Sequence, residues 1–502
     1  MFETDGLTAI VYGLLDAGVG VATGVVGFPV TDMINRLRPI WRAAINEKVG
    51  LDIALGATAT GTRSAFISKH VGLNVASDSL ITAATQGIGA GLIIIAGDDP
   101  GAQASQNEQD SRYYGKMAEI PVLEPNGVQN MYDSIIEGFK VSEQQSVPVI
   151  ARVTSRLLKM GGALERSSVE RVSGVRFQKD NWKLTFLGRH QYHLKNTYPQ
   201  LMKFAETTTL NEGHGAGAVG IISAGYASVL VEETIDEADN IAHLKLGLTN
   251  PLCERRIATF LEEHQKVIVI EEGAPIIEEA IRGKVLGKFS GHVPRTGALQ
   301  HEDVERALNY VEADFIGAKP DVETLESRGH AASICQDCPF LPFYYALEKF
   351  ETMVAGDLGC VIKTANSPLE LLDVAYSLGS AIGVATGFEQ EGVAVLGDYA
   401  FLHGGIEALL SAILFRQSVK VFVLENRVSA ITGGQPTPEA SDLISALCRN
   451  YGVLYKEVDA QSCTEAALSD LLRMVNSTTG IIVVVIKGIC KKYAACREDR
   501  QD

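Results

Sequence analysis

The sequence predicts an α/β protein made of three domains in series. Its 502 residues exceed one ordinary domain and correspond to about three domains of roughly 150 residues each. Short apolar segments typical of strands alternate with segments of helical spacing, which is the pattern of parallel sheets covered by helices. Two polar stretches interrupt this alternation, so we expect domains at residues 1–166, 167–317 and 318–502.

The first domain is expected to open with a helix, because apolar residues recur at helical spacing over residues 7–15 and Gly18 follows them. Strands should follow at residues 19–26, 63–69, 92–96 and 147–153. Residues 167–215 are polar and irregular, and they are predicted to form a connection.

The second domain is expected to repeat a strand and a helix three times. The strands are predicted at residues 218–223, 244–248 and 266–271, and the helices at residues 227–238, 255–263 and 276–284. A second connection is expected over residues 318–333. The third domain should contain strands at residues 393–396, 420–424 and 481–486.

The charge balance disfavours two classes of partner. The chain has 61 acidic and 44 basic residues, a formal net charge of -17, whereas nucleic acids and anionic membranes need basic patches. The acidic first residues lack the basic region of a signal peptide. The longest apolar run, residues 87–97, is too short to span a bilayer. We therefore expect a cytoplasmic protein that binds neither nucleic acid nor membrane.

The eight cysteines are dispersed, so a disulfide framework is not expected. Only Cys335 and Cys338 form a Cys-x-x-Cys. They are packing thiols, a redox pair, or half of a metal site completed by a partner. A zinc or iron–sulfur site usually needs four ligands, so we expect no iron–sulfur cluster in this chain. The alternative is a cluster assembled from Cys335, Cys338, Cys360 and a cysteine brought close by folding.

Two polar stretches follow strands of the third domain. Gly397-Asp398-Tyr399 follows residues 393–396, and Glu425-Asn426 follows residues 420–424. Strands of a parallel sheet present such residues at the carboxyl edge, where α/β folds bind ligands. The alternative is that both stretches are ordinary turns. Their joint occurrence favours a ligand site.

That ligand site suits a diphosphate and a magnesium ion. Gly404 and Gly405 are expected to open a helix that ends near Phe415, and the free N–H groups of such a helix start bind phosphates. Mg²⁺ prefers six oxygen ligands. The Asp398 carboxylate, the Asn426 side-chain oxygen and the Val428 carbonyl would supply three, with diphosphate and water completing the set.

This spacing resembles the thiamine diphosphate motif Gly-Asp-Gly followed after some two dozen residues by Asn, with Tyr399 in place of the third glycine. Nearly the whole chain resembles the alpha subunit of indolepyruvate ferredoxin oxidoreductases. The residues that carry the resemblance are Asn46-Glu47-Lys48-Val49, Lys69-His70-Val71-Gly72-Leu73-Asn74-Val75-Ala76-Ser77-Asp78, Asn107-Glu108-Gln109-Asp110-Ser111-Arg112-Tyr113-Tyr114, Gly356-Asp357-Leu358-Gly359-Cys360, Phe401-Leu402-His403-Gly404-Gly405, Glu425-Asn426-Arg427 and Thr432-Gly433-Gly434-Gln435-Pro436.

The resemblance implies a role for each domain. The first would bind the aminopyrimidine of the cofactor and the last its diphosphate, while the middle one would resemble the C-terminal domain of transketolases. Glu47 would face the pyrimidine N1′ and share the proton whose movement activates the cofactor. Its alternative is a surface glutamate beside Lys48.

The resemblance also implies the remaining site residues. His70 and His403 are acid–base candidates, or else structural histidines. Arg112 would bind a substrate carboxylate, or else belong to a solvated loop. The cofactor contacts would come from Glu47, Gly397, Asp398, Tyr399, Gly404, Gly405, Asn426 and Thr432.

The implied function is thiamine diphosphate- and Mg²⁺-dependent decarboxylation of an arylpyruvate-like 2-oxo acid, by the catalytic subunit of a 2-oxo acid:ferredoxin oxidoreductase. Its partners would be a separate beta or iron–sulfur subunit, in a homodimer or heterotetramer. One alternative is a non-oxidative decarboxylase or carboligase. The other is an inactive scaffold, which the intact Glu47, Asp398 and Asn426 argue against. The chain lacks the family's ferredoxin-type cysteine run, and Phe28 and Gly434 replace its usual threonine and histidine.

Overall fold

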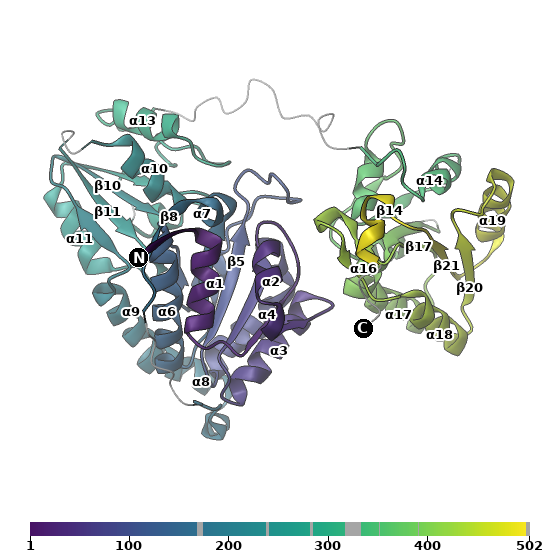
Figure 1. Cartoon of the computed structure of the whole chain (residues 1–502), viewed down its shortest axis with the longest axis horizontal. Coiled ribbons are helices and arrows are strands. Elements are labelled where there is room, and N and C mark those ends of the chain that lie inside the picture. The colour runs from purple at the N-terminus through teal and green to yellow at the C-terminus, as the bar shows by residue number, and fades with distance from the viewer. Residues whose placement is uncertain are drawn as a thin grey trace. The chain divides into compact units, whose positions relative to one another are not determined.

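The computed structural model describes residues 1–167, 174–236, 240–281, 285–316, 333–350, 352–389 and 391–497. The chain divides into two compact units, Met1–Glu323 and Thr324–Asp502, which Figure 1 colours from purple to teal and from green to yellow. The predicted α/β class is confirmed. The three predicted domain boundaries stay predictions, and the expected connection over residues 318–333 lies almost wholly outside the described residues.

A seven-stranded sheet forms the centre of the first unit. Its strands lie in the order β12 (Leu248–Asn250), β6 (Val122–Leu123), β7 (Val149–Thr154), β5 (Leu92–Asp98), β4 (Ser64–Lys69), β2 (Val21–Gly24) and β3 (Trp41–Ala43). All neighbours are parallel except β12, which pairs antiparallel with β6. The four predicted strands of the first domain are therefore present, with bounds shifted by at most a few residues.

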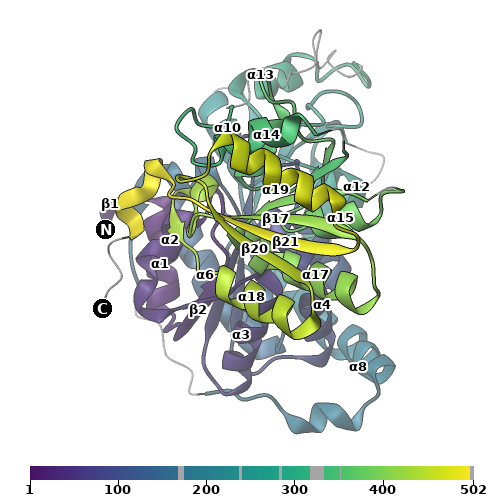
Figure 2. The ribbon, with the colours of Figure 1, turned by 90° about the vertical axis from the view of Figure 1, so that its right-hand side faces the viewer.

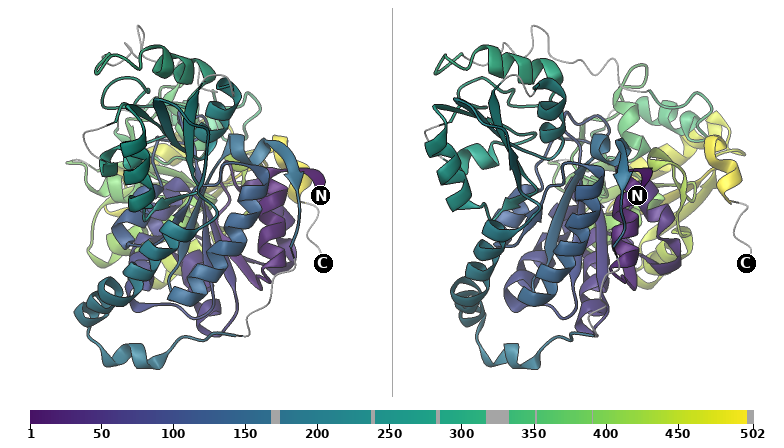
Figure 3. Two further views of the ribbon diagram at one scale, coloured as in Figure 1. Left: turned by 90° about the vertical axis from the view of Figure 1, so that its left-hand side faces the viewer. Right: turned by 60° about the vertical axis from the view of Figure 1, so that its left-hand side comes forward.

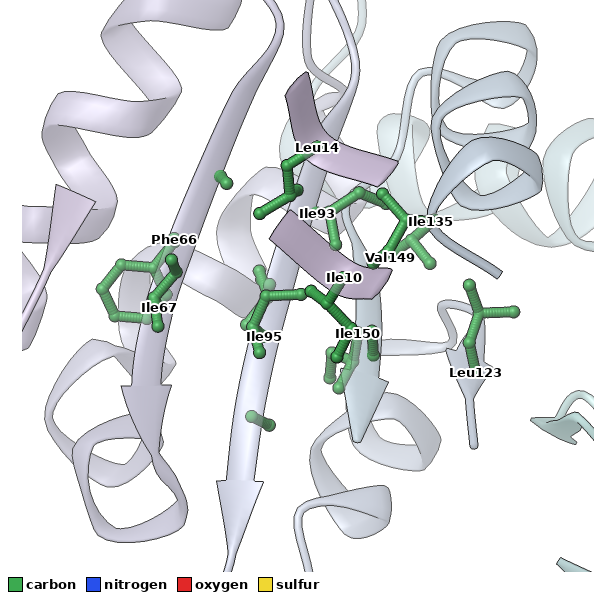
Figure 4. Packing of buried hydrophobic residues seen from close by; sticks show 14 of the residues in the cluster. Ile10, Leu14, Phe66, Ile67, Ile93, Ile95, Leu123, Ile135, Val149 and Ile150 are labelled. Atoms are coloured by element: carbon green, nitrogen blue, oxygen red, sulfur yellow. The ribbon is translucent and has the colours of Figure 1, made fainter. Parts of the chain in front are cut away.

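Helices cover this sheet and close its core. Helices α1 (Gly6–Asp16) and α6 (Val128–Gln145) pack together, as do α3 (Glu47–Ala59) and α4 (His70–Gln86). Figure 4 shows Ile10 and Leu14 of α1 near the buried side chains of β5 and β7. The predicted opening helix is thus confirmed, and its apolar stripe is what anchors it. Shorter elements complete the region: β1 (Phe2–Asp5), α2 (Thr31–Arg36), η1 (Arg38–Ile40), α5 (Arg112–Ala118), α7 (Ser155–Lys159) and β8 (Gly161–Leu164).

A second sheet in the first unit has four strands, in the order β13 (Lys266–Ile270), β10 (Val219–Ala224), β11 (Ile241–Leu246) and β9 (Glu212–His214). Figure 3 gives two views of it, in teal. Alternate residues of a strand face opposite sides, so Ile221 packs with α10 (Tyr226–Thr234) and α13 (His301–Asn309), while Ile222 packs with α11 (Glu254–Glu263) and α12 (Ile276–Ile281). The end of the helix predicted over residues 276–284 lies outside the described residues.

The prediction of an irregular connection over residues 167–215 is wrong. The described part contains η2 (Lys179–Lys183), α8 (Phe186–Tyr192), η3 (His193–Thr197) and α9 (Tyr198–Thr207). Helix α9 buries Leu201 and Ala205 against the core of the first sheet. Two apolar residues four positions apart suffice to anchor a short helix, and the polar residues between them hid this pattern.

The second unit contains a six-stranded sheet, in the order β15 (Val374–Ala375), β14 (Val354–Gly356), β16 (Val393–Gly397), β17 (Val419–Glu425), β21 (Ile481–Lys487) and β20 (Leu454–Asp459). All its neighbours are parallel. Helices α14 (Leu341–Glu348) and α19 (Glu465–Ser477) pack on one face, and α15 (Ala381–Thr386), α17 (Ile406–Leu414) and α18 (Ser441–Tyr451) on the other, as Figure 2 shows.

The remaining elements of this unit are short: η6 (Cys360–Ala365), α16 (Asp398–Ala400), η7 (Phe401–Gly405), β18 (Val428–Ser429), η8 (Ala430–Thr432), β19 (Gln435–Pro436) and η9 (Lys491–Arg497). Across the described ranges of both units, no helix combines the length and apolar character needed to cross a bilayer.

Candidate functional site

Three adjacent strands of the second unit end in polar residues at one edge of the sheet. Strands β14, β16 and β17 lie side by side and run parallel, and they are followed by Asp357, Asp398 and Asn426. The carboxyl edge of a parallel sheet is where α/β folds bind ligands. The two stretches that the sequence singles out, 28 positions apart, are therefore brought together.

Asp398 is the centre of this edge and is only 2% exposed. Its Oδ1 accepts a hydrogen bond from Tyr399 N at 2.8 Å, and its Oδ2 accepts from Asn426 N at 3.1 Å and Arg427 N at 2.6 Å. Asn426 Oδ1 in turn accepts from Val428 N at 3.0 Å. Arg427 adopts a left-handed φ of 62°, a conformation that costs energy for a non-glycine residue and is typical of functional loops.

Two further carboxylates are buried near Asp398, and the sequence analysis gave neither a role. Neither oxygen of Asp357, and only one oxygen of Glu425, has a hydrogen-bond partner among the described residues. Burial raises the pKa of Asp357 to about 7, with the nearby N–H groups of Gly359 and Gly397 acting against it. Burial likewise raises the pKa of Asp398 to about 6, against hydrogen bonds from the backbone. Three carboxylates buried near one another suit a bound divalent cation.

The helix at this edge begins earlier than predicted. It starts at Asp398, continues through the wider π-helical turn η7 and ends at Leu414, so Gly404 and Gly405 lie inside the helical run. The glycine pair suggested a helix start, but a π turn tolerates it within the helix. The N–H groups of the first turn therefore belong to residues near Asp398. A side chain built at Gly397 would meet nothing within 4 Å, which leaves open space at this helix start.

The other predicted residues of the second unit lie around the same edge. His403 is 9% exposed in η7, with its ring centroid 6.1 Å from that of Tyr399. Thr432 lies in the loop after Asn426, where its hydroxyl contacts Gln435 Oε1 at 2.7 Å and Ser429 Oγ at 2.8 Å. These bonds hold the loop. Gly434 has a φ of 84°, and a side chain there would collide with the Tyr493 ring.

In the first unit, Glu47 lies at the carboxyl edge of the seven-stranded sheet. It is the first residue of α3, follows β3, and is 6% exposed. Asn46 caps the helix by accepting a hydrogen bond from Val49 N at 3.0 Å. A Cβ placed on Gly72 would lie 2.6 Å from Glu47 Cγ, so the glycine is what lets the glutamate side chain pass over α4.

Lys69 ends β4 beside Glu47, a neighbour that the sequence analysis did not single out. Burial lowers the pKa of Lys69, while the charges of Asp99 and Glu47 act to raise it. The ammonium therefore lies within electrostatic reach of the Glu47 carboxylate. The sequence offered one signal, since Lys69 and His70 stand at the end of a predicted strand, as Asp398 does. A single lysine at the end of a strand is too common to identify a functional site.

His70 holds a loop. Its ring is fully buried, with Nδ1 3.3 Å from the carbonyl oxygen of Gly97 and Nε2 3.2 Å from that of Asn107. One nitrogen thus faces a backbone oxygen of β5 and the other faces one of the segment that links β5 to α5. This geometry is that of a structural histidine, and the acid–base role of His70 stays a prediction.

The prediction that Arg112 meets a substrate carboxylate is wrong in geometry. Its side chain is fully buried and bonds Asp110 at 2.6 Å and Glu271 at 2.7 Å. It also donates to the carbonyl oxygens of Glu272 and Ala274, each at 2.8 Å. Every guanidinium nitrogen is therefore engaged within the protein, and the residue ties α5 to the end of β13.

Folding also gathers cysteines that are distant in the sequence. Burial raises the pKa of Cys338 to about 12, and the thiols of Cys360, Cys335 and Cys490 add to this effect. Burial raises the pKa of Cys360 to about 11, and Cys490 and Cys335 add to this effect. The spacing left open a grouping of Cys335, Cys338 and Cys360 with one further cysteine, and Cys490 is that cysteine.

These thiols lie beside the carboxylate edge, since Asp357 also acts on the pKa of Cys360. They are spread more widely than ligands of one ion. Among the described side chains, the one group of three or more potential ligands whose atoms lie within 4.8 Å of one another is His214, Glu232 and His243.

Comparison with known proteins matches both units. Residues 357–485 match the family model described as thiamine pyrophosphate enzyme, C-terminal TPP binding domain. Residues 40–174 match the one described as pyruvate flavodoxin/ferredoxin oxidoreductase, thiamine diP-bdg. The first contains Asp357, Asp398 and Asn426, and the second contains Glu47.

Curated relatives match along most of the chain. Indolepyruvate oxidoreductase subunit IorA of Methanothermobacter thermautotrophicus is 33% identical over 86% of this chain and 76% of its own length. That of Methanothermobacter marburgensis is 32% identical with the same shares, and that of Archaeoglobus fulgidus is 30% identical over 97% of this chain and 86% of its own length. The resemblance drawn from the motifs is confirmed, as is the expectation of an oxidoreductase subunit built on thiamine diphosphate-binding domains. The chain therefore belongs to the family of indolepyruvate oxidoreductase subunit IorA.

Proposed function

We propose that this chain is the catalytic subunit of a thiamine diphosphate- and Mg²⁺-dependent oxidoreductase that decarboxylates an arylpyruvate-like 2-oxo acid. The observation that carries the proposal is the meeting of Asp398 and Asn426 at the carboxyl edge of the sheet, beside the buried Asp357. The family supports oxidation of a 2-oxo acid. The printed name of the relatives, indolepyruvate oxidoreductase, supports the aryl side chain.

The residues of the second unit fit a diphosphate bound through a divalent ion. Asp398 and the Asn426 side-chain oxygen would bind Mg²⁺ together with the Val428 carbonyl, because hard cations take oxygen ligands. The helix start at Asp398, with open space beside Gly397, would receive the diphosphate on its backbone N–H groups. The buried Asp357 would place a further negative charge against the ion.

The first unit would activate the cofactor. When bound, thiamine diphosphate supplies the nucleophilic carbon that attacks the 2-oxo group and accommodates the negative charge left by carbon dioxide. Glu47 would hold the proton shared with the pyrimidine N1′. Lys69, beside Glu47, would keep positive charge at this edge and attract an anionic substrate.

The gathered thiols favour the oxidative outcome over the non-oxidative decarboxylase. In the oxidative reaction, a 2-oxo acid and a thiol that serves as second substrate give a thioester, carbon dioxide, two protons and two electrons. The electrons must leave one at a time if the acceptor is an iron–sulfur protein. Cys335, Cys338, Cys360 and Cys490 offer the four thiolates that one cluster takes. We therefore replace the expectation of a cluster-free chain with a site for one, from which electrons pass to a partner subunit.

Cofactor binding is tested by calorimetry with thiamine diphosphate in the presence and absence of Mg²⁺. Asp398→Ala should abolish Mg²⁺-dependent binding, because it removes a ligand and a charge. Asp470→Ala is the matched control, since Asp470 is exposed and pairs only with Arg473 among the described residues. Equal affinity in Asp398→Ala and the control would refute the assignment.

The oxidative outcome is tested on anaerobically purified protein. Iron and sulfide analysis should give about four irons per chain, and Cys490→Ser should lower that content while the partly buried Cys463→Ser leaves it unchanged. Product analysis on a panel of 2-oxo acids, with and without an electron acceptor and a thiol, should give a thioester only when both are present. Aldehyde release without an acceptor, by iron-free protein, would identify a decarboxylase instead.

A further inference from the structure

Two histidines face each other across the edge of the four-stranded sheet. His214 ends the edge strand β9, and His243 lies directly opposite it on β11 in the antiparallel register. Their ring centroids are 5.4 Å apart. Glu232, on α10, reaches the same place, and one ligand atom from each of the three side chains lies within 4.8 Å of the other two.

His243 is oriented as a metal-bound histidine would be. Its ring is fully buried, and Nε2 lies 2.6 Å from Ser223 Oγ, which is 2.8 Å from Ser228 Oγ. Its other nitrogen, Nδ1, is buried and has no hydrogen-bond partner in the described part of the chain. Metal-bound histidines donate the N–H of the second ring nitrogen to such an acceptor, which fixes the ring and leaves the first nitrogen for the ion.

The unpartnered Nδ1 of His243 also suits a metal, within the described part of the chain. A buried nitrogen acceptor without a donor is otherwise costly, and a bound cation would satisfy it.

The charges around the three side chains leave room for a divalent ion. Lys245 bonds Glu212 and Glu232, each at 2.7 Å. Two carboxylates against one ammonium leave one net negative charge beside the histidines. The lysine orients Glu232 through one of its oxygens, and the second oxygen of that carboxylate remains available as a ligand.

We propose that His214, Glu232 and His243 bind a zinc-class divalent ion, with water as the fourth ligand. Two imidazole nitrogens and one carboxylate are a donor set that zinc takes in tetrahedral sites. The ion would join the edge strand β9, the inner strand β11 and helix α10. Within the first unit, this site lies on a different sheet from the edge that carries Glu47, so it would stabilise the four-stranded sheet and leave the chemistry unchanged.

The test is Zn²⁺ binding to the whole chain after treatment with a chelator. Zinc analysis after equilibrium dialysis should show one equivalent lost in His214→Ala and in Glu232→Gln. His301→Ala is the matched control, because His301 is an exposed histidine paired with the neighbouring Glu233 at 2.8 Å. Ser223→Ala keeps all three ligands but removes the partner of Nε2, and it should weaken binding about 10–100-fold.

Replacing zinc with Co²⁺ distinguishes metal bound at the proposed site from metal bound by cysteines. Cobalt at His214, Glu232 and His243 should give weak visible bands without the intense thiolate charge-transfer absorption that cysteine ligands produce. His214 is exposed at a sheet edge, so its substitution should leave the fold intact, as circular dichroism would verify. Equal zinc content in all four variants, or thiolate absorption from every bound cobalt, would overturn the proposal.

Discussion

Removing the Arg112 side chain should destabilise the first unit rather than weaken substrate binding. Arg112→Met keeps much of the volume but deletes the charge that faces Asp110 and Glu271. Burial alone would raise the pKa of Asp110, but Arg112 and Arg152 hold that pKa well below its usual value. In the variant these carboxylates remain buried with less positive charge to balance them.

The expected magnitude follows from that burial. Breaking a buried ion pair by deleting one partner costs about 3–5 kcal/mol, and the carbonyl oxygens of Glu272 and Ala274 also lose a donor. Since domains are stable by about 5–15 kcal/mol, a loss of this size removes a large part of the stability of the unit. An exposed pair is worth about 1 kcal/mol or less.

The assay is urea unfolding followed by tryptophan fluorescence. Both tryptophans of the chain, Trp41 and Trp182, belong to the first unit, so the signal reports on that unit alone. The control is Lys183→Met, which removes the exposed pair with Asp180 and should leave the midpoint nearly unchanged. If Arg112→Met unfolds at the wild-type urea concentration while KM for the 2-oxo acid rises, the residue binds substrate and the structural interpretation fails.

Three further predictions concern the first unit. Glu47→Gln should keep thiamine diphosphate affinity but lose most of kcat, since an amide cannot share the activating proton; a kcat close to wild type would exclude the role. Gly72→Ala should also lower kcat, because the added methyl would collide with Ser68 Oγ and displace Glu47, whereas Gly56→Ala, with nothing within 4 Å of its added Cβ, should be neutral in the same turnover assay. Metal-free protein should lose stability as pH falls from 6.5 toward 3, because His243 stays neutral in the folded chain and takes up a proton when the chain unfolds. The loss should be up to about 1.4 kcal/mol per pH unit, and the urea midpoint should depend less on pH in His243→Gln.

The sequence was most informative where chemistry depends on local position. Asp398 and Asn426 each follow a strand, and parallel pairing of adjacent strands alone brings them together. Glu47 was found through the resemblance and not through its neighbours. Its burial could not be predicted, because it depends on the passage that Gly72 leaves over a different helix.

The sequence was least informative where distant segments combine. Arg112 looked like part of a polar loop because its partner Glu271 is 159 residues away. The fourth thiol, that of Cys490, could not be named from the sequence for the same reason, since it joins Cys335 and Cys338 only in the folded unit. The glycine pair at Gly404 suggested a helix start, because a π turn leaves no distinct mark in a sequence.

The antiparallel pairing of β12 with β6 has a consequence for biosynthesis. The last strand of the seven-stranded sheet ends at Asn250, about 100 residues after the end of β7, the strand of this sheet that precedes it in the sequence. We expect the nascent sheet to wait on the ribosome with an exposed edge at β6, open to pairing with other chains. Protease resistance of ribosome-arrested chains should therefore appear only once the segment through Asn250 has left the exit tunnel. Resistance of the full sheet in chains arrested well before that point would contradict this order.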